Sequence, residues 1–376
     1  ATAIDLQTIT IGSAVLSVAV GVSPNNANVI AGSSMVKVGS FDFSSQYSAY
    51  TVDKIKVKVS NNAATSITSV TLRYQNTSGV NTDSSAVLAS PAATESYATA
   101  TFTGLTFYIP SGTTKKLDVY VNLSTIQNDG DSGKAISVAL DANEGFSATD
   151  SSGATKTLLA SSDLVSDGTT GKGTMYVRKS IPTLSVVALD TSTLSAGSNK
   201  TIGRFKVMAD AAGDVSWGKI AFTVNKTASL TLGATSTIKL WQGTNVIAGT
   251  FATTTGDYAS QSQAFTTDAT SGLLVFVPDS EQTISAGTQL TYELRGTVGG
   301  IAVNSNSLDV SIWNPSTSVV TGTASEIGIT VDDSPSFTWS DRSSVSLTHS
   351  TTTTDWTNDY LINTLPLTVG NMSVTI

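Results

Sequence analysis

Apolar and polar residues alternate with a period of two along much of this chain, which is the pattern of a β-strand with one buried and one solvated face. The clearest examples are VLSVAVGV (15–22), KIKVKVS (54–60), KLDVYVNL (116–123), AISVAL (135–140) and SLDVSI (307–312). Clusters rich in Asn, Asp, Gly and Ser, such as QNTSGVNTDSS and SDGTTGKG, separate these segments and are typical of turns. We find no helical period. The pattern therefore predicts an all-β fold of antiparallel sheets.

Blocks of sequence from the first half of the chain reappear in the second half. The matched blocks are IAGSSMVKVGSFDF (30–43) with SAGSNKTIGRFKV (195–207), VDKIKVKVSN (52–61) with WGKIAFTVNK (217–226), FYIPSGTTKKLDVYV (107–121) with VFVPDSEQTISAGTQLTYEL (275–294), and ISVAL (136–140) with LDVSI (308–312). Their common order indicates an internal repeat. We predict two tandem, elaborated immunoglobulin-like antiparallel β-sandwiches, each larger than the usual domain of about 100 residues.

The ends of the two predicted sandwiches are set by a weaker match. TMYVRKS (174–180) at the end of the first repeat matches SVSLTHS (344–350). This match places the first sandwich at 13–180 and the second at 181–350. Residues 1–12 and 351–376 are then left over, and we predict an N-terminal strand extension and a C-terminal linker followed by a strand extension.

Both predicted extensions carry alternating apolar residues suited to assembly. These residues are Ile4, Leu6, Ile9, Ile11, Leu365, Leu367, Val369, Met372, Val374 and Ile376. The alternation changes phase at Gly370 and Asn371, which predicts a β-bulge. Such strands need a cover, because exposed apolar surface costs about 25 cal/mol per Å² and unpaired edges invite pairing. The cover is either the chain's own sandwich or a neighbouring copy, whose sheet the strand would complete in an open, head-to-tail assembly.

The composition narrows the classes of partner. At 376 residues the chain is long enough for two hydrophobic cores. Only 13% of the residues are charged and the net charge is −8, so we expect no nucleic-acid partner, which would require clustered Lys and Arg. No apolar run is long enough to span a membrane, and the chain has no cysteine. Ala1 in place of Met fits a mature chain whose export signal has been removed, and an arbitrary boundary fits equally.

The residues able to carry catalysis do not form a motif. His349 is the only histidine, so a Ser-His-Asp triad would depend on it alone, and we interpret it as a polar surface residue. The few glutamates are scattered, and the aspartates lie mainly in turn clusters, so no pair of facing carboxylates is indicated. We predict no catalytic residues and no enzymatic activity.

Two kinds of binding site remain as alternatives. The turn QNDGDSGK (127–134) carries Asp129 and Asp131, a candidate calcium pair, but it lacks the closing Glu of a complete calcium loop. A solvated turn with no cofactor is favoured, and calcium is the alternative. All tryptophans lie in the second half of the chain, where exposed rings would suit glycans. We favour Trp217 and Trp313 as core residues and Trp356 as an anchor of the tail.

A resemblance gives these observations a biological setting. An LSV strand, an AGS turn, a G-x-F strand and an apolar KI-x-V-x-V strand together resemble the tandem immunoglobulin-like modules of bacterial and archaeal surface and S-layer-like proteins. The segment TWSDRSSVSLTHSTTTTDWTNDYLI (338–362) is similar to the C-terminal part of surface proteins from uncultivated, small-genome bacteria. The resemblance implies an exported structural protein of the cell surface.

The resemblance and the terminal strands together predict a secreted protein that assembles with copies of itself into a filament or S-layer. The alternative is a surface adhesin that binds glycans through its loops or the Trp-containing face of the second repeat. The cell envelope and surface glycans are the other candidate partners, and the expected location is extracellular.

Overall fold

Strands dominate the structure, a computed structural model that describes residues 12–89, 97–126, 131–141, 144–159, 164–165, 171–256, 270–302, 306–312, 316–329, 335–344 and 348–374. The helices α1 (Asn61–Ala64), η3 (Thr235–Thr237) and α2 (Ala324–Ile327) are short. The prediction of an all-β fold built from antiparallel sheets is therefore confirmed. Within the described ranges, no helix is long and apolar enough to cross a membrane.

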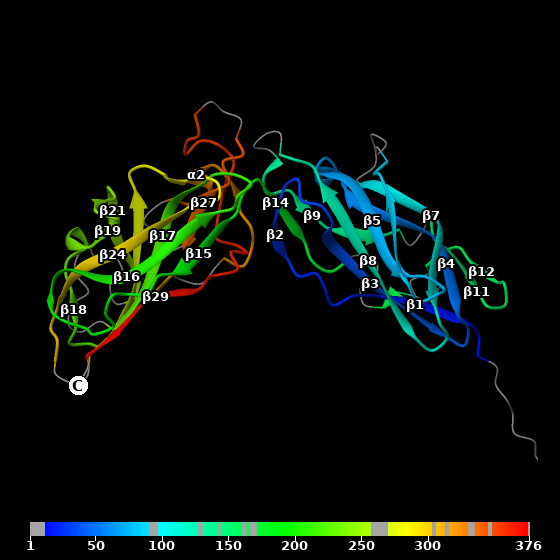
Figure 1. The fold of residues 1–376 in the computed structure, drawn as a ribbon, viewed down its shortest axis with the longest axis horizontal. Coiled ribbons are helices and arrows are strands. Elements are labelled where there is room, and N and C mark those ends of the chain that lie inside the picture. Colours follow the sequence, from blue (N-terminus) through cyan, green and yellow to red (C-terminus); the bar gives the residue numbers. More distant parts are fainter. Residues whose placement is uncertain are drawn as a thin grey trace, which may run out of the picture. The chain divides into compact units, whose positions relative to one another are not determined.

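The chain divides into two compact units (Figure 1). Unit 1 comprises the described residues up to Ala27, Gly32–Thr125 and Lys134–Tyr176, and unit 2 comprises Asn28–Ala31, the described residues of 126–133, and the chain from Val177 onward. The main division after Tyr176 lies four residues before Ser180, where the sequence pattern placed the end of the first sandwich.

Unit 1 is built from two main sheets. The first has the order β13 (Leu164–Val165), β1 (Val15–Val20), β3 (Val36–Gln46), β8 (Thr114–Leu123), β5 (Ile67–Gln75), β6 (Asn81–Ala86). The second contains β10 (Val138–Leu140), β4 (Tyr50–Ser60), β11 (Ser147–Asp150), β12 (Thr155–Lys156) and β7 (Tyr97–Ile109), which pairs with β4. The inner faces of the sheets meet where the ring of Phe43 on β3 contacts that of Phe107 on β7, with centroids 5.2 Å apart. A further small sheet consists of β2 (Ala27–Ile30), β14 (Met175–Arg178) and β9 (Ala135–Ile136).

Unit 2 is a second sandwich. One sheet has the order β15 (Pro182–Val186), β16 (Gly197–Ala209), β24 (Gln289–Gly299), β19 (Lys239–Gln242), β20 (Asn245–Val246), with β18 (Thr231–Leu232) beside β24. The other has the order β21 (Gly249–Gly256), β22 (Ser271–Pro278), β17 (Val215–Lys226), β27 (Phe337–Ser340), β28 (Trp356–Thr357), β26 (Thr321–Gly322), with β23 (Gln282–Ile284), β25 (Ser307–Ile312) and β29 (Leu367–Ser373) attached. Long strands rich in Val, Ile, Phe and Trp therefore form both layers.

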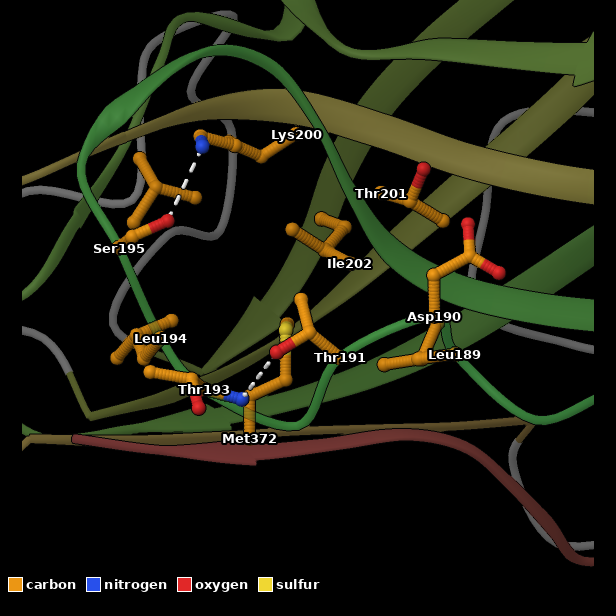
Figure 2. A pocket seen from close by; sticks show the side chains of 11 residues that line it. Leu189, Asp190, Thr191, Thr193, Leu194, Ser195, Lys200, Thr201, Ile202 and Met372 are labelled. Atoms are coloured by element: carbon orange, nitrogen blue, oxygen red, sulfur yellow. Dashed lines mark hydrogen bonds between the residues drawn. The ribbon is translucent and has the colours of Figure 1, made fainter. Parts of the chain in front are cut away.

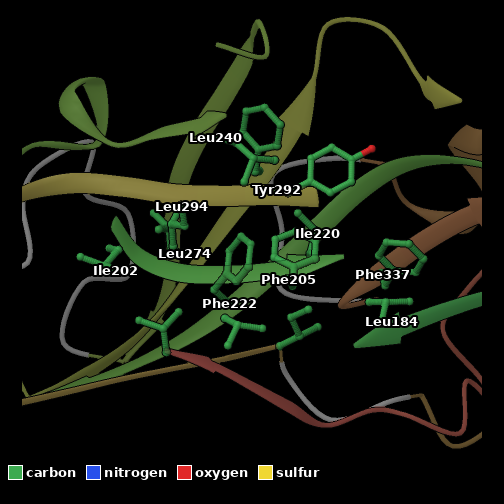
Figure 3. Packing of buried hydrophobic residues seen from close by; sticks show 14 of the residues in the cluster. Leu184, Ile202, Phe205, Ile220, Phe222, Leu240, Leu274, Tyr292, Leu294 and Phe337 are labelled. Carbon is green, nitrogen blue, oxygen red and sulfur yellow. The ribbon is translucent and has the colours of Figure 1, made fainter. Parts of the chain in front are cut away.

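The core of unit 2 lies between these two sheets (Figure 3). Phe205 and Tyr292 from the first sheet stack with ring centroids 5.4 Å apart, and Trp217 from the second meets Tyr292 edge to face at 5.3 Å. The Trp217 indole N–H donates a hydrogen bond of 3.2 Å to the Tyr292 hydroxyl, so the buried polar ends of both side chains are paired. The prediction that Trp217 is a core residue is confirmed.

The two units share the order of their main strands. The order β1, β3, β8, β5, β6 in unit 1 matches β15, β16, β24, β19, β20 in unit 2. In the other sheet, β4 pairs with β10, β7 and β11, as β17 pairs with β25, β22 and β27. The sequence blocks matched above lie on these equivalent strands, so the internal repeat is a structural one.

The structure corrects the matching of the last strands. Met175 of β14 is opposite Ile136 of β9, and Met372 of β29 is opposite Leu308 of β25. Because Ile136 and Leu308 occupy matched positions in ISVAL and LDVSI, β29 is the counterpart of β14. The segment 344–350, whose residues 345–347 lie outside the described ranges, is not that counterpart.

The second sandwich therefore extends beyond residue 350. The described part of 351–376 contains β28 and β29, which are strands of the unit 2 sheet. Trp356 at its centre is fully buried. The expected C-terminal linker and extension are thus, as far as Val374, part of unit 2, because their backbone hydrogen bonds and apolar side chains find partners within that unit.

Candidate functional site at the C-terminal strand

The strand β29 lies between two segments of unit 2. Along one edge it is antiparallel to β25, from Ser307 opposite Ser373 to Ile312 opposite Leu367. Along the other edge, its C-terminal end is parallel to the segment that follows β15: the Leu194 N–H donates to the Ser373 carbonyl at 2.8 Å, and the Ser373 N–H donates to the Ser192 carbonyl at 3.0 Å. In Figure 1 β29 is the red strand running beside β15. The last strand is therefore held along both of its edges.

The apolar side chains predicted to drive assembly point into the core of this same unit. Leu365, Val369 and Met372 are buried there, and Leu367 and Val374 pack against the same core. Of the two covers considered for this strand, the structure contains the one within the chain. The remaining predicted assembly residues, Ile4, Leu6, Ile9, Ile11 and Ile376, lie outside the described residues.

A change of register lies in β29 next to the position that the sequence pattern indicated. The pairing with β25 shifts between Val310 and Ser311, which face Gly370 and Thr368, so Val369 is the extra residue. A Cβ atom on Gly370 would overlap the carbonyl oxygen of Ile202 on β16. Glycine is required here because β29 crosses the backbone of β16 at close range. The same arrangement recurs in unit 1, where a Cβ on Gly171 would lie 3.1 Å from the Cα of Gly39.

Two hollows flank the contact between β29 and the segment after β15. The first has a volume of about 140 Å³ and includes Asp190, Lys200 and Met372 in its lining (Figure 2). Its charged groups are engaged already: Lys200 Nζ donates to Ser195 Oγ at 3.0 Å, and Asp190 forms an ion pair with Arg204 at 2.8 Å. This hollow is smaller than the roughly 300–1,000 Å³ of ligand pockets, and we assign no ligand to it.

The second hollow is larger and runs beside β29 itself. It has a volume of about 530 Å³ and is lined by Val186–Ser192 and Thr368–Asn371. The middle of β29 is therefore less tightly enclosed on this edge than its C-terminal end, where the hydrogen bonds to Ser192 and Leu194 lie. Both hollows therefore include residues of β29 in their lining.

His349 is part of a buried polar cluster rather than a surface residue. Its Nε2 lies 2.8 Å from Ser340 Oγ and 3.2 Å from an oxygen of Asp355, and its Nδ1 lies 2.7 Å from an oxygen of Glu281. Its side chain is only 5% exposed, so the surface interpretation of this histidine was wrong. Ser340, His349 and Asp355 lie close together in the sequence, but Glu281 comes from a distant segment, and the pattern did not indicate that these side chains meet.

The cluster contains Ser, His and carboxylate groups, but its environment differs from that of a nucleophilic triad. Burial tends to lower the pKa of His349, yet hydrogen bonds to Asp355 and Glu281 and their charges raise it to about 9. A protonated imidazole cannot accept a proton from Ser340. Ser340 is also fully buried, and its Oγ already accepts a hydrogen bond of 2.9 Å from the Arg342 N–H. We interpret the cluster as a set of ion pairs and hydrogen bonds that holds the chain before β29 in place.

A second buried network surrounds Arg178 of β14. Its guanidinium donates to Ser132 Oγ at 3.1 Å and to Thr357 Oγ1 at 2.8 Å, and Ser132 donates in turn to Asp341 at 2.9 Å. Burial raises the pKa of Asp341, whereas Arg178 and the hydrogen bonds oppose that shift. The network holds the described part of the turn 127–134 through Ser132.

The calcium alternative at this turn stays a prediction. Asp131 is described and forms a polar interaction, while Asp129 lies outside the described residues. Within the part of the chain that the structure describes, no three or more His, Asp or Glu side chains are grouped so as to hold a metal ion. The two aspartates can therefore be tested only by experiment.

The tryptophans that the structure describes offer little surface for a glycan. Trp217, Trp339 and Trp356 are fully buried, and Trp313 lies outside the described residues. Trp241 on β19 is partly exposed, and the Arg295 guanidinium lies 4.5 Å from its ring centroid. The expected role of Trp356 as a buried anchor agrees with its position, because its indole N–H donates to the Ser350 carbonyl at 2.9 Å.

Comparisons with known proteins give only general likenesses. No family model and no curated protein matches the chain. Among solved structures, the C-terminal domain of the antigen I/II polypeptide BspA of Streptococcus agalactiae has a TM-score of 0.22 and 10% identity, covering 79% of this chain and 95% of that one. The C-terminal domain of the antigen I/II-family protein AspA of Streptococcus pyogenes has a TM-score of 0.23 and 9% identity, covering 81% and 96%. The major pilin RrgB of Streptococcus pneumoniae has a TM-score of 0.19 and 12% identity, covering 74% and 45%. TM-scores this low carry no inference about function.

Proposed function

We propose that this chain is an extracellular structural protein of the cell surface, and that its copies assemble head to tail into a filament or surface layer by exchanging β29. The observation that carries the proposal is the position of β29: it is the last of the described strands, it follows β28 after a segment of its own, and it contributes Val369 and Met372 to the core. A strand in this position can be supplied by a neighbouring copy without loss of any contact.

The chain before β29 supplies a suitable hinge. Asp359 is fully buried, and its carboxylate accepts a hydrogen bond of 2.8 Å from the Ser316 N–H. Beyond it, Asn363 and Pro366 are exposed. Residues 360–366 can span about 25 Å when extended. Release of this segment would let β29 reach a neighbouring unit 2. It would also withdraw Ile362 and Leu365 from the core and break the hydrogen bond of the Leu184 N–H to Thr364 Oγ1, which is the cost that exchange has to offset.

One-way exchange has a definite consequence for assembly. Each copy would donate its own β29 and accept that of the next copy, which is a heterologous contact that produces open chains. Since the same side chains meet the same groove within a copy and between copies, concentration and the strain of the hinge decide which form dominates. The low charge and the abundance of Ser and Thr suit a densely packed surface material.

Because the chain contains no cysteine, introduced cysteine pairs can test the exchange directly. Ser307 on β25 is opposite Ser373 on β29, and both side chains are exposed. A Ser307→Cys copy mixed with a Ser373→Cys copy and refolded together should form disulfide-linked dimers that contain one copy of each variant. The control mixture pairs Ser307→Cys with Thr368→Cys, because Thr368 is opposite Ser311 and too distant to form the bond.

A second variant separates exchange from folding. The double variant Ser307→Cys/Ser373→Cys, oxidised as a monomer, should keep β29 within its own unit and stay monomeric at concentrations where the unmodified chain assembles. The exchange mechanism is contradicted if the mixed single variants yield no linked species, or if the locked variant assembles as well as the unmodified chain.

The second candidate function is that of a surface adhesin. It draws on Trp241, the partly exposed ring on β19, because partly exposed aromatic rings can stack on sugars. A glycan-binding screen with a Trp241→Ala comparison tests it. Binding that disappears in this variant, in a chain that stays monomeric, would favour the adhesin over the assembling subunit.

A further inference from the structure

The last strand of each repeat is parallel to a segment near the beginning of the same repeat. In the second repeat these are β29 and the segment around Thr193, joined by the hydrogen bonds of Leu194 and Ser192 with Ser373. In the first repeat, the N–H groups of Ala27 and Ala31 donate to the carbonyls of Thr174 and Arg178 at 3.1 and 2.8 Å, so the neighbouring strands β2 and β14 run in the same direction. The strands β1 and β13 are also parallel.

Parallel pairing of the first and last segments determines how a pull on the chain reaches these hydrogen bonds. In a parallel pair, the start of one strand and the end of the other lie at opposite ends of the pair. Tension applied through these two points slides the strands along one another, so that their hydrogen bonds are loaded together. If the pull instead opened the pair from one end, the bonds would be loaded one after another and would break at a lower force.

The packing of β29 adds to this resistance. To leave its place by sliding, β29 must break its pairing with β25 and withdraw Val369 and Met372 from the core. It must also move past β16, which Gly370 approaches so closely that a Cβ would overlap the Ile202 carbonyl. Hydrogen bonds and interlocked side chains therefore oppose the same movement.

We propose that each sandwich is a mechanical element that resists tension along the chain, and that in the second repeat the contact of β29 with Ser192–Leu194 is its clamp. The property is that of a single copy whose β29 lies in its own unit, so it can be tested on the monomer and does not require exchange of β29. It would let a surface protein remain folded under shear, where survival is governed by the rate of forced unfolding and not by equilibrium stability.

Single-molecule force spectroscopy tests the clamp through the choice of attachment point. One handle is placed at the N-terminus and the other either on a cysteine added after the last residue or on Asn363→Cys, which is exposed and precedes β29. Pulling at residue 363 leaves β29 outside the path of the force. We expect unit 2 to unfold at a clearly lower force from residue 363 than from the C-terminal cysteine. An equal or higher force from residue 363 would overturn the proposal.

The unfolding of unit 1 provides an internal reference in every trace. Each unit releases about 3.5 Å of length per residue, so the larger unit 2 can be recognised by its longer extension. The force of the unit 1 event should be the same for both attachment points. A change in that event equal to the change in unit 2 would also count against the clamp.

A substitution provides the second arm. Ser373→Pro removes the N–H that donates to the Ser192 carbonyl, whereas Ser373→Ala keeps that N–H and loses only an exposed hydroxyl. With the C-terminal attachment, the proline variant should lower the unfolding force of unit 2 and the alanine variant should leave it unchanged. Equal forces for the two variants would contradict the clamp, and near-ultraviolet circular dichroism confirms beforehand that both are folded.

Discussion

Gly370 provides the most direct test of how β29 is seated in unit 2. We predict that Gly370→Ala destabilises this unit strongly, because the added methyl group would overlap the Ile202 carbonyl oxygen in the backbone of β16. A flexible side chain could move aside, but here two paired strands would have to separate. Gly370 has no positive φ that would add backbone strain, so the effect isolates the steric contact.

The size of the effect follows from the contact. Overpacking a well-packed core costs about 1–3 kcal/mol, and a clash with backbone places this variant near the upper value. For a unit of roughly 200 residues, 1 kcal/mol shifts the melting temperature by about 2–4 °C, so about 3 kcal/mol corresponds to a decrease of about 6–12 °C. The control is Asn371→Ala at the next position, where the side chain is exposed. This substitution should change the free energy of unfolding by about 0.5 kcal/mol at most.

Tryptophan fluorescence is the appropriate assay, because all the tryptophans lie at positions 217–356. Urea titrations that follow tryptophan fluorescence therefore measure the unfolding of unit 2. We expect the highest urea midpoint for the wild type, a slightly lower one for Asn371→Ala, and a much lower one for Gly370→Ala. If Gly370→Ala unfolds at the midpoint of the wild type, β29 is not seated against β16 as described, and the reasoning is refuted.

Three further predictions concern the buried polar groups of unit 2, each measured by tryptophan-detected unfolding. The pKa of His349 is raised from its usual value near 6.5 to about 9. Its contribution to the free energy of unfolding should therefore be complete below pH 6.5 and should be lost as the pH rises toward 9. His349→Gln should remove this pH dependence of stability. Tyr292→Phe should cost about 1–3 kcal/mol, because it leaves the buried indole N–H of Trp217 without its acceptor, whereas an equal midpoint would contradict that role. Arg178→Leu should cost about 3–5 kcal/mol by leaving the buried Asp341 carboxylate uncompensated, and adding Asp341→Leu should recover part of the loss.

Local pattern was sufficient for the strands and for the repeat. Alternation of apolar residues identified β4, β8 and β25, because burial of one sheet face leaves a period of two in the sequence. The matched blocks around Gly39 and Gly203 identified equivalent strands, and in both repeats a second glycine lies close to the matched one, Gly171 beside Gly39 and Gly370 beside Gly203. The change of phase near Gly370 indicated the irregularity in β29 to within a residue or two.

Pairing between distant strands was beyond the reach of the sequence. The sequence pattern matched TMYVRKS (174–180) with SVSLTHS (344–350), and only the shared partner position of Ile136 and Leu308 identifies β29 as the counterpart of β14. Because of this mismatch, the sequence pattern predicted the core strand β29 as part of a C-terminal extension. Similarly, His349 meets Glu281 across 68 positions of sequence, a contact that no spacing rule indicates.

The sequence by itself determined that this protein is a tandem pair of β-sandwich repeats with an apolar last strand, because the period of two and the repeated blocks are properties of neighbouring residues. Only the tertiary structure decided where that last strand lies, between β25 and the segment 192–194. It also decided which buried charged side chains hold the chain before this strand in place. The physical reason is that side-chain alternation specifies which face of a strand is buried, whereas the neighbour of each edge is selected by hydrogen bonds and packing between residues far apart in the chain.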